Sequence, residues 1–146
     1  MNRAATTAAA LALVLPVLTG CGGGRTYCDT VQSHQAELGT IISSGGRGAL
    51  LRALPIFEDL QASAPSDVAD DWQLLVTRVT ALRTALTDAH VDPASYDPAH
   101  PPAGITPAQR TTILRAAAGV GAADTRQALA DLQQEVLDVC HTPLEL

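Results

Sequence analysis

The sequence predicts an all-α fold, a four- to five-helix up-and-down bundle closed by a disulfide between its first and last helices. Apolar residues recur at spacings of three and four in several segments, which is the helical period. No segment shows sustained alternation of apolar and polar residues, and aromatic residues make up only 3% of the chain. Strands are therefore not expected.

Residues 1–20 have the layout of a signal peptide, because Arg3 gives a positive start and residues 4–17 are uncharged and rich in Ala, Leu and Val. This apolar run is shorter than the roughly 20 residues that a membrane-spanning helix needs. The sequence Leu18-Thr19-Gly20-Cys21 resembles the lipobox of bacterial lipoproteins. The resemblance implies cleavage before Cys21 and a diacylglyceryl group on its sulfur. The alternative is an ordinary secretory signal with an incidental cysteine.

Residues 21–26 are predicted to form a lipidated Gly-rich tether, because three successive glycines give flexibility without bulk. Two acyl chains are enough for stable anchoring. The membrane is thus an expected partner, reached through the lipid.

Residues 27–146 are predicted to form one helical domain, with Cys28 near its start and Cys140 near its end. Disulfides form in oxidising compartments outside the cytoplasm, so these two cysteines are expected to pair. The alternative is two unrelated thiols.

The first helix is expected over 27–42, where Val31, Leu38 and Ile42 lie on one face, and Ser43 to Gly46 end it. The following stretch "SSGGRGA", residues 43–49, is either a flexible turn or a cradle for an anion beside Arg47. A second helical pattern covers 48–65, and Pro55 predicts a kink or break near Leu54.

The third helix is expected over 66–90, with Ser66 as its N-cap and acidic residues in its first turns. Its apolar seam consists of Val68, Trp72, Leu75, Val79, Leu82, Leu86 and Ala89. A fourth helix starts with a capping box, in which Thr106 is the N-cap and Gln109 lies at the third helical position. The last helix runs over 125–140 and ends before Pro143.

Residues 90–106 contain four prolines and form a long connection for a bundle. A stiff, extended loop of this kind could present Tyr96 and His100 to a partner. The alternative is a rigid strap that carries the chain from one end of the bundle to the other, with Tyr96 packed against helices.

The composition excludes several function classes. After residue 20 the chain has eight arginines and fifteen acidic residues, a formal charge of −7, which disfavours nucleic-acid binding. The chain has no lysine, so it has no Walker A loop and no Schiff-base lysine. No two of the four histidines have the spacing of ligands on one helix face, and no metal site, cofactor or catalytic residue is expected.

The chain from "YCDTVQSHQAEL" through "DDWQ" and "VDPASYDPAHPPAGIT" to "VCHTPLEL" resembles a group of small uncharacterised actinobacterial lipoproteins. The resemblance implies a lipid-anchored protein on the extracytoplasmic face of the cell membrane, and it implies no activity.

Two functions are weighed from the sequence. The first is a non-catalytic helical interaction module of the cell envelope that binds an envelope protein or polymer through Tyr96 and His100. The alternative is a carrier or sensor that holds a small apolar ligand within the helical bundle.

Overall fold

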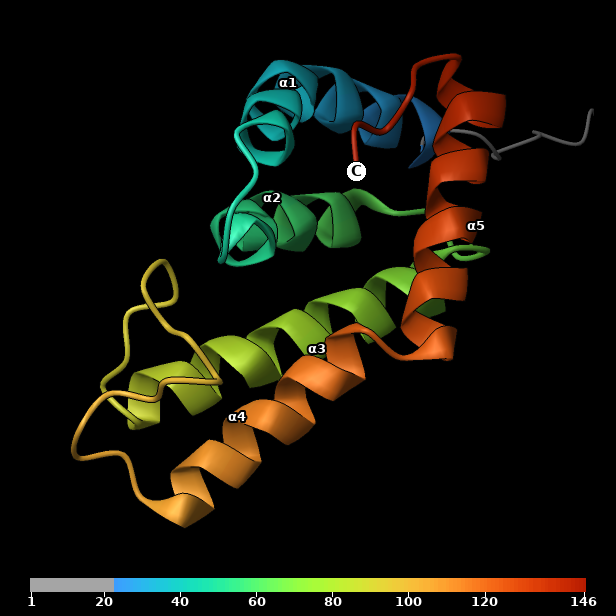
Figure 1. Cartoon of the computed structure of the whole chain (residues 1–146). Coiled ribbons are helices and arrows are strands. Elements are labelled where there is room, and N and C mark those ends of the chain that lie inside the picture. Colours follow the sequence, from blue (N-terminus) through green and yellow to red (C-terminus); the bar gives the residue numbers. More distant parts are fainter. Residues whose placement is uncertain (1–22) are drawn as a thin grey trace, which may run out of the picture.

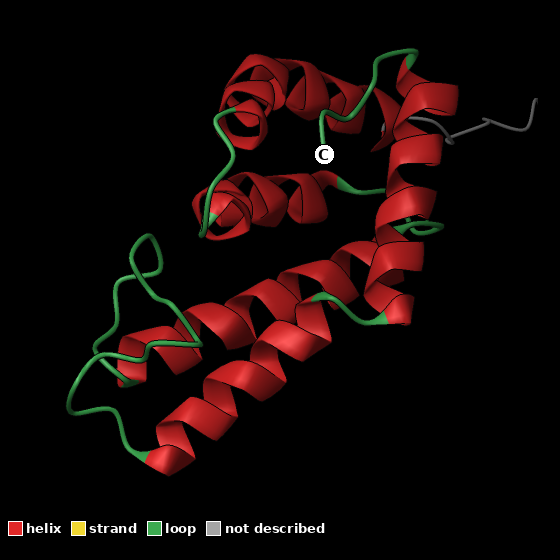
Figure 2. Ribbon diagram, in the orientation of Figure 1, coloured by secondary structure: helices red, strands yellow, loops and turns green. Residues whose placement is uncertain are grey.

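The computed structural model describes residues 23–146, and this part of the chain is all-α (Figures 1 and 2). No strand occurs among the described residues, which confirms the predicted fold class. The five helices are α1 (Gly23–Ser43), α2 (Ala49–Ser63), α3 (Ala69–Asp88), α4 (Pro107–Val120) and α5 (Ala123–Cys140).

Helices α1 to α4 alternate in direction, as an up-and-down order predicts (Figure 1). Helix α2 packs between α1 and α3, and α4 packs along α3. Helix α5 runs across the ends of α1 and α3 and contacts both (Figure 1).

The main hydrophobic core lies between α1, α2, the first half of α3 and α5. Each of its large apolar side chains contributes roughly 1.5–3 kcal/mol when it is withdrawn from water. The largest fully buried side chains are those of Trp72, Tyr27, Phe57, Leu38, Leu54, Leu60, Leu75, Leu132, Val31, Val79 and Val136. Most of them belong to the helical seams predicted from the sequence.

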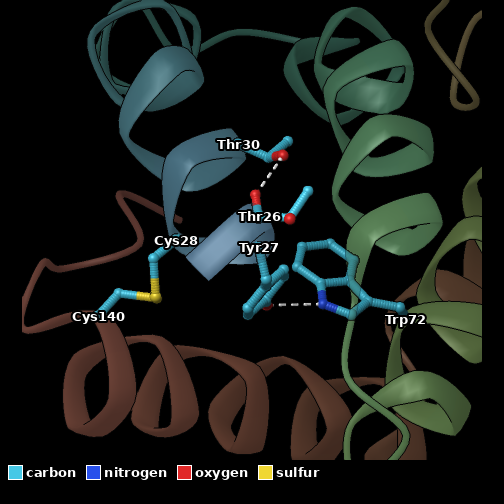
Figure 3. The surroundings of a disulfide bond; sticks show 6 residues. All are labelled: Thr26, Tyr27, Cys28, Thr30, Trp72 and Cys140. Atoms are coloured by element: carbon cyan, nitrogen blue, oxygen red, sulfur yellow. Dashed lines mark hydrogen bonds between the residues drawn. A yellow bond between two sulfur atoms is a disulfide. The ribbon is translucent and has the colours of Figure 1, made fainter. Parts of the chain in front are cut away.

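The predicted disulfide is present and joins Cys28 in α1 to Cys140 at the end of α5 (Figure 3). Their Cα atoms lie 5.2 Å apart, and the bridge closes a sequence separation of 112 residues. Because disulfides persist in oxidising compartments, the bridge indicates an extracytoplasmic domain.

The C-terminal residues 141–146 fold back along α1 and α5, which the sequence pattern does not predict. Leu144 is buried in the main core. The side-chain amide of Gln35 donates a hydrogen bond to the Pro143 carbonyl at 3.4 Å, and that of Gln133 donates to the Leu146 carbonyl at 2.8 Å.

Of the kink or break predicted near Leu54, the break is wrong, because α2 runs without interruption from Ala49 to Ser63 with Pro55 inside it. Pro55 itself is exposed, whereas Leu54 and Ile56 beside it are buried. A proline inside a helix costs about 3 kcal/mol or more. Burial of the apolar side chains around Pro55 offsets this cost.

Two helix starts also differ from the prediction. Helix α3 begins at Ala69 after a turn in which the Val68 amide donates to the Pro65 carbonyl at 3.3 Å, so Ser66 is not its N-cap. This turn lets Val68 enter the core. Helix α1 begins at Gly23, so residues 23–26, which the sequence assigns to the tether, are helical.

Candidate ligand-binding groove

An apolar groove lies where α2 begins and α3 ends, under the loop 89–106 and against α4. In Figure 1 this loop lies at the opposite end of the molecule from the start of α1. The groove has a volume of about 410 Å³, within the roughly 300–1,000 Å³ range of small-molecule sites. Its apolar walls include Leu51, Leu82, Leu86, Pro93, Ile113 and Leu114.

The groove is built on a second hydrophobic cluster, separate from the main core. The seam of α3 continues past the main core to Leu86, which is buried against Ile113 of α4 and Tyr96 of the loop. Because α4 begins at a capping box that fixes its first turn, Ile113 is held against α3. The floor of the groove is therefore formed by apolar side chains of α3 and α4.

The loop over the groove is shaped by a repeated turn, Asp-Pro-Ala, which starts at Asp92 and again at Asp97. The Asp92 carboxylate accepts a hydrogen bond from the Ala94 amide at 2.9 Å, and the Asp97 carboxylate accepts one from the Ala99 amide at 3.0 Å. Aspartate side chains that bond the backbone two residues on make compact turns.

Two arginines tie this loop to helix starts. Nη1 of Arg47, just before α2, donates to the Tyr96 carbonyl at 2.9 Å. Nη2 of Arg110 in the first turn of α4 donates to the Pro98 carbonyl at 3.2 Å. The loop thus straps the start of α2 to the start of α4, and its packing against helices agrees with the strap alternative. It does not carry the chain from one end of the bundle to the other, because α3 ends and α4 begins at the same end (Figure 1).

Tyr96 is not presented at the surface, which corrects the expectation that it reaches outward to a partner. Its side chain is only 8% exposed and belongs to the second hydrophobic cluster, because burial of the ring against α3 and α4 is favourable. It lines the groove, and its buried hydroxyl has no hydrogen-bond partner among the described residues.

His100, the other residue predicted to meet a partner, is exposed at the outside of the loop. Its Nδ1 lies 3.1 Å from Oδ2 of Asp97. This hydrogen bond, with that from the Ala99 amide, holds the pKa of Asp97 below its ordinary value. The structure therefore separates the two predicted residues, with Tyr96 inside the loop and His100 outside it.

Cys21, the predicted lipidation site, lies outside the described residues. The nearest described element, the start of α1, is beside the Cys28–Cys140 bridge (Figure 3). No helix within residues 23–146 is long and apolar enough to span a bilayer.

Acidic side chains gather between the start of α3 and α5, away from the groove. Partial burial and repulsion by Asp131 and Asp70 raise the pKa of Asp71 above its ordinary value. Partial burial and repulsion by Asp67 and Asp138 raise the pKa of Glu135 in the same direction. This acidic cluster lies away from the groove, and no acidic residue is among the residues that line the groove.

In the part of the chain that the structure describes, no three His, Cys, Asp or Glu side chains lie close enough to share a metal ion. His34 instead lies 3.2 Å from the Asp59 carboxylate, between α1 and α2. The groove combines apolar walls, a buried hydroxyl and a neighbouring guanidinium group.

No known family model, curated protein or solved structure matches this chain.

Sequence reasoning names Tyr96 but misses the groove around it. Ile113 and Leu114 are visible in the sequence as apolar positions of one helix, and Arg47 as the cation of a glycine-rich stretch. These residues come together because of how α2, α3 and α4 pack, and this packing cannot be predicted from the spacing of residues along the chain.

Proposed function

We propose that this protein is a lipid-anchored, non-catalytic binding protein on the extracytoplasmic face of the cell membrane, which holds a small apolar ligand as a carrier or sensor. The observation that supports this proposal is the apolar groove of about 410 Å³ at the end of the fold opposite the start of α1. An anchor on Cys21 would leave this end free to meet a ligand.

The small ligand is preferred over an envelope protein or polymer as the partner. A surface for a large partner would use Tyr96 and His100 together, and only His100 is exposed. A concave apolar site with few polar groups instead suits a small molecule.

The anchor is tested by denaturing mass spectrometry of the protein extracted from its own membranes. A chain that begins at Cys21 and has at least the mass of a diacylglyceryl group is expected. An unmodified chain found in the medium would contradict anchoring and leave a secreted protein.

Binding is tested by native mass spectrometry of the same preparation, in a detergent whose mass is known. We expect an additional small non-covalent mass that is absent from the denatured spectrum. Leu114 lines the groove and is 44% exposed, so Leu114→Gln should reduce the bound fraction without disturbing the core. Leu137 on α5 is 48% exposed and does not line the groove, so Leu137→Gln is the matched control.

Retention of the ligand by the Leu137 variant but not by the Leu114 variant supports the groove as the site. Equal retention by both variants, or a spectrum without any small bound mass, would contradict this function. A bound protein mass in place of a small one would favour the interaction module.

A further inference from the structure

A second hollow adjoins the groove and has a different chemistry. It has a volume of about 350 Å³ and shares Arg47, Leu51 and Pro93 with the groove. Two more arginines line it, Arg52 from α2 and Arg83 from α3. We call this second site the arginine hollow. The two sites together form a continuous surface that is apolar on one side and cationic on the other.

Three of the eight arginines after residue 20 thus line one hollow, in a chain with fifteen acidic residues. One acidic residue, Asp92, also lines it, and its carboxylate accepts hydrogen bonds from the Ala94 amide and the Ser95 hydroxyl. The arginines outnumber the carboxylates there, although the opposite holds for the chain.

The guanidinium groups of Arg47 and Arg52 bond to neutral acceptors within the described residues. Arg47 donates to the Tyr96 carbonyl, and Nη2 of Arg52 donates to the Ser44 hydroxyl at 3.1 Å and the Gly45 carbonyl at 3.2 Å. Neither lies within 4 Å of a described carboxylate. Asp97 is near enough to Arg47 for the cation to lower its pKa, but it bonds to His100.

Arg78 and Arg83, in contrast, each form an ion pair with a carboxylate. Arg78 forms an ion pair of 3.1 Å with Asp124, and Arg83 forms a longer one of 3.5 Å with Glu58, on an exposed surface where such pairs contribute little. Arg47 and Arg52 therefore form no ion pair with a described carboxylate beside the groove, and Arg83 is weakly paired. A bound anion would complete their charge-assisted hydrogen bonds.

The start of α2 adds to the positive electrostatic field of the arginine hollow. No side chain caps this helix, and Gly48 before it has φ of 91°. The first amide of the helix, that of Ala49, donates to the Gly46 carbonyl at 3.4 Å. The positive end of a helix dipole favours an anion. Gly48 lines both the groove and the arginine hollow.

We propose that the ligand of this protein is an amphipathic anion, a small molecule whose apolar chain lies in the groove and whose phosphate or carboxylate head lies in the arginine hollow. This inference rests on the proposed function and adds the charge of the ligand to it. The charge complementarity of Arg47 and Arg52 selects the head, and the walls of the groove select the chain.

Four probes separate these contributions: octyl phosphate, 1-octanol, octylammonium and inorganic phosphate. They are titrated by calorimetry into the oxidised chain from residue 22, which contains all five helices, both hydrophobic clusters and the disulfide. Octyl phosphate is expected to bind about tenfold or more tightly than 1-octanol, because a charge-assisted head is added to the same chain. Octylammonium and inorganic phosphate are expected to bind more weakly than octyl phosphate.

Arg52 lines the arginine hollow but not the groove, so Arg52→Gln is expected to lower the affinity for octyl phosphate about tenfold and to leave that for 1-octanol unchanged within about twofold. Arg47→Gln also removes the hydrogen bond to the Tyr96 carbonyl, so it is expected to weaken both ligands, and octyl phosphate more than 1-octanol. Arg25 at the start of α1 lies away from both sites, so Arg25→Gln removes the same charge as a control. It should change the affinity for octyl phosphate less than about twofold, because distant surface charges are screened.

Equal affinities for octyl phosphate and 1-octanol would overturn the anionic head while leaving the proposed function in place. If inorganic phosphate binds as tightly as octyl phosphate, the apolar chain does not use the groove and the inference is overturned. If Arg25→Gln loses as much affinity for octyl phosphate as Arg52→Gln does, net charge explains the effect and the arginine hollow is overturned as the site of the head. If no alkyl probe binds, both the inference and the proposed function fail.

Discussion

The indole Nε1 of Trp72 donates a hydrogen bond of 2.8 Å to the hydroxyl of Tyr27 inside the main core (Figure 3). Both side chains are wholly buried. Tyr27 precedes Cys28 in α1, and Trp72 lies in the first turns of α3, where its ring packs against Phe57 of α2. The bond therefore joins two helices next to the disulfide that joins α1 to α5.

Replacement of Tyr27 by Phe is expected to lower the free energy of unfolding by about 1–3 kcal/mol, because the buried Trp72 N–H is left without an acceptor. The measurement is urea unfolding of the oxidised protein, followed by far-ultraviolet circular dichroism. An unchanged free energy would show that the bond contributes nothing to stability.

Tyr96→Phe is the matched control, since it removes the same hydroxyl from another buried tyrosine. That hydroxyl has no hydrogen-bond partner among the described residues. Its removal should therefore leave stability within about 0.5 kcal/mol of the wild type or raise it. A cost equal to that of Tyr27→Phe would contradict the difference between the two sites.

The free energy of unfolding should depend on pH because the Tyr27 hydroxyl is buried. Burial, opposed by the bond from Trp72, raises the pKa of its hydroxyl from 10.0 to about 12. The folded protein thus keeps a proton that the unfolded chain loses, so the free energy of unfolding falls as the pH rises from 10 to 12. The loss attributable to Tyr27 is about 2.7 kcal/mol at the upper limit.

Unfolding curves at several pH values in this window, compared between the wild type and Tyr27→Phe, isolate that contribution. The wild type should lose more stability than the variant. Parallel losses in the two proteins would assign the pH dependence to other groups.

Reduction of the Cys28–Cys140 disulfide is expected to lower the free energy of unfolding by up to about 4.7 kcal/mol, the loop-entropy value for a closed loop of about 100 residues. Thermal unfolding with and without dithiothreitol measures the effect. The double variant Cys28→Ser, Cys140→Ser should match the reduced wild type and should not respond to the reductant. A wild type whose melting temperature is insensitive to reduction would contradict the expected contribution.

Local signals in the sequence predicted the helices best where they agreed with tertiary packing. Thr106 and Gln109 form the predicted capping box, in which the Gln109 amide donates to the Thr106 hydroxyl at 3.2 Å. The apolar seam of α3 is buried along most of its length, including Trp72 and Leu86. Such patterns act over a few residues, so the sequence alone reveals them.

Packing overrode local signals elsewhere. Ser66 is a good N-cap residue, but burial of Val68 moves the start of α3, and α2 accepts Pro55 because its neighbours are buried. The groove could not be predicted in the same way. Arg47 and Leu86 both line the groove because three helices and a loop converge there. No periodic pattern in the sequence predicts this convergence.

Gly48→Ala tests the connection between the glycine-rich turn and the strap loop. Gly48 has φ of 91°, and a Cβ atom there would lie 3.3 Å from Cβ of Pro93. Gly104 has a similar φ of 99° but has no atom within 4 Å of the same position, so Gly104→Ala is the matched control. Both alanines incur about 1–2 kcal/mol of backbone strain.

The Gly48 variant should lose more stability than the Gly104 variant, because only there must the loop also shift away from α2. Since Pro93 lines the groove and the arginine hollow, the same shift should weaken octyl phosphate binding in the Gly48 variant alone. Equal stability losses in urea unfolding would show that Pro93 yields freely. The contact between Gly48 and Pro93 would then not set the width of the groove.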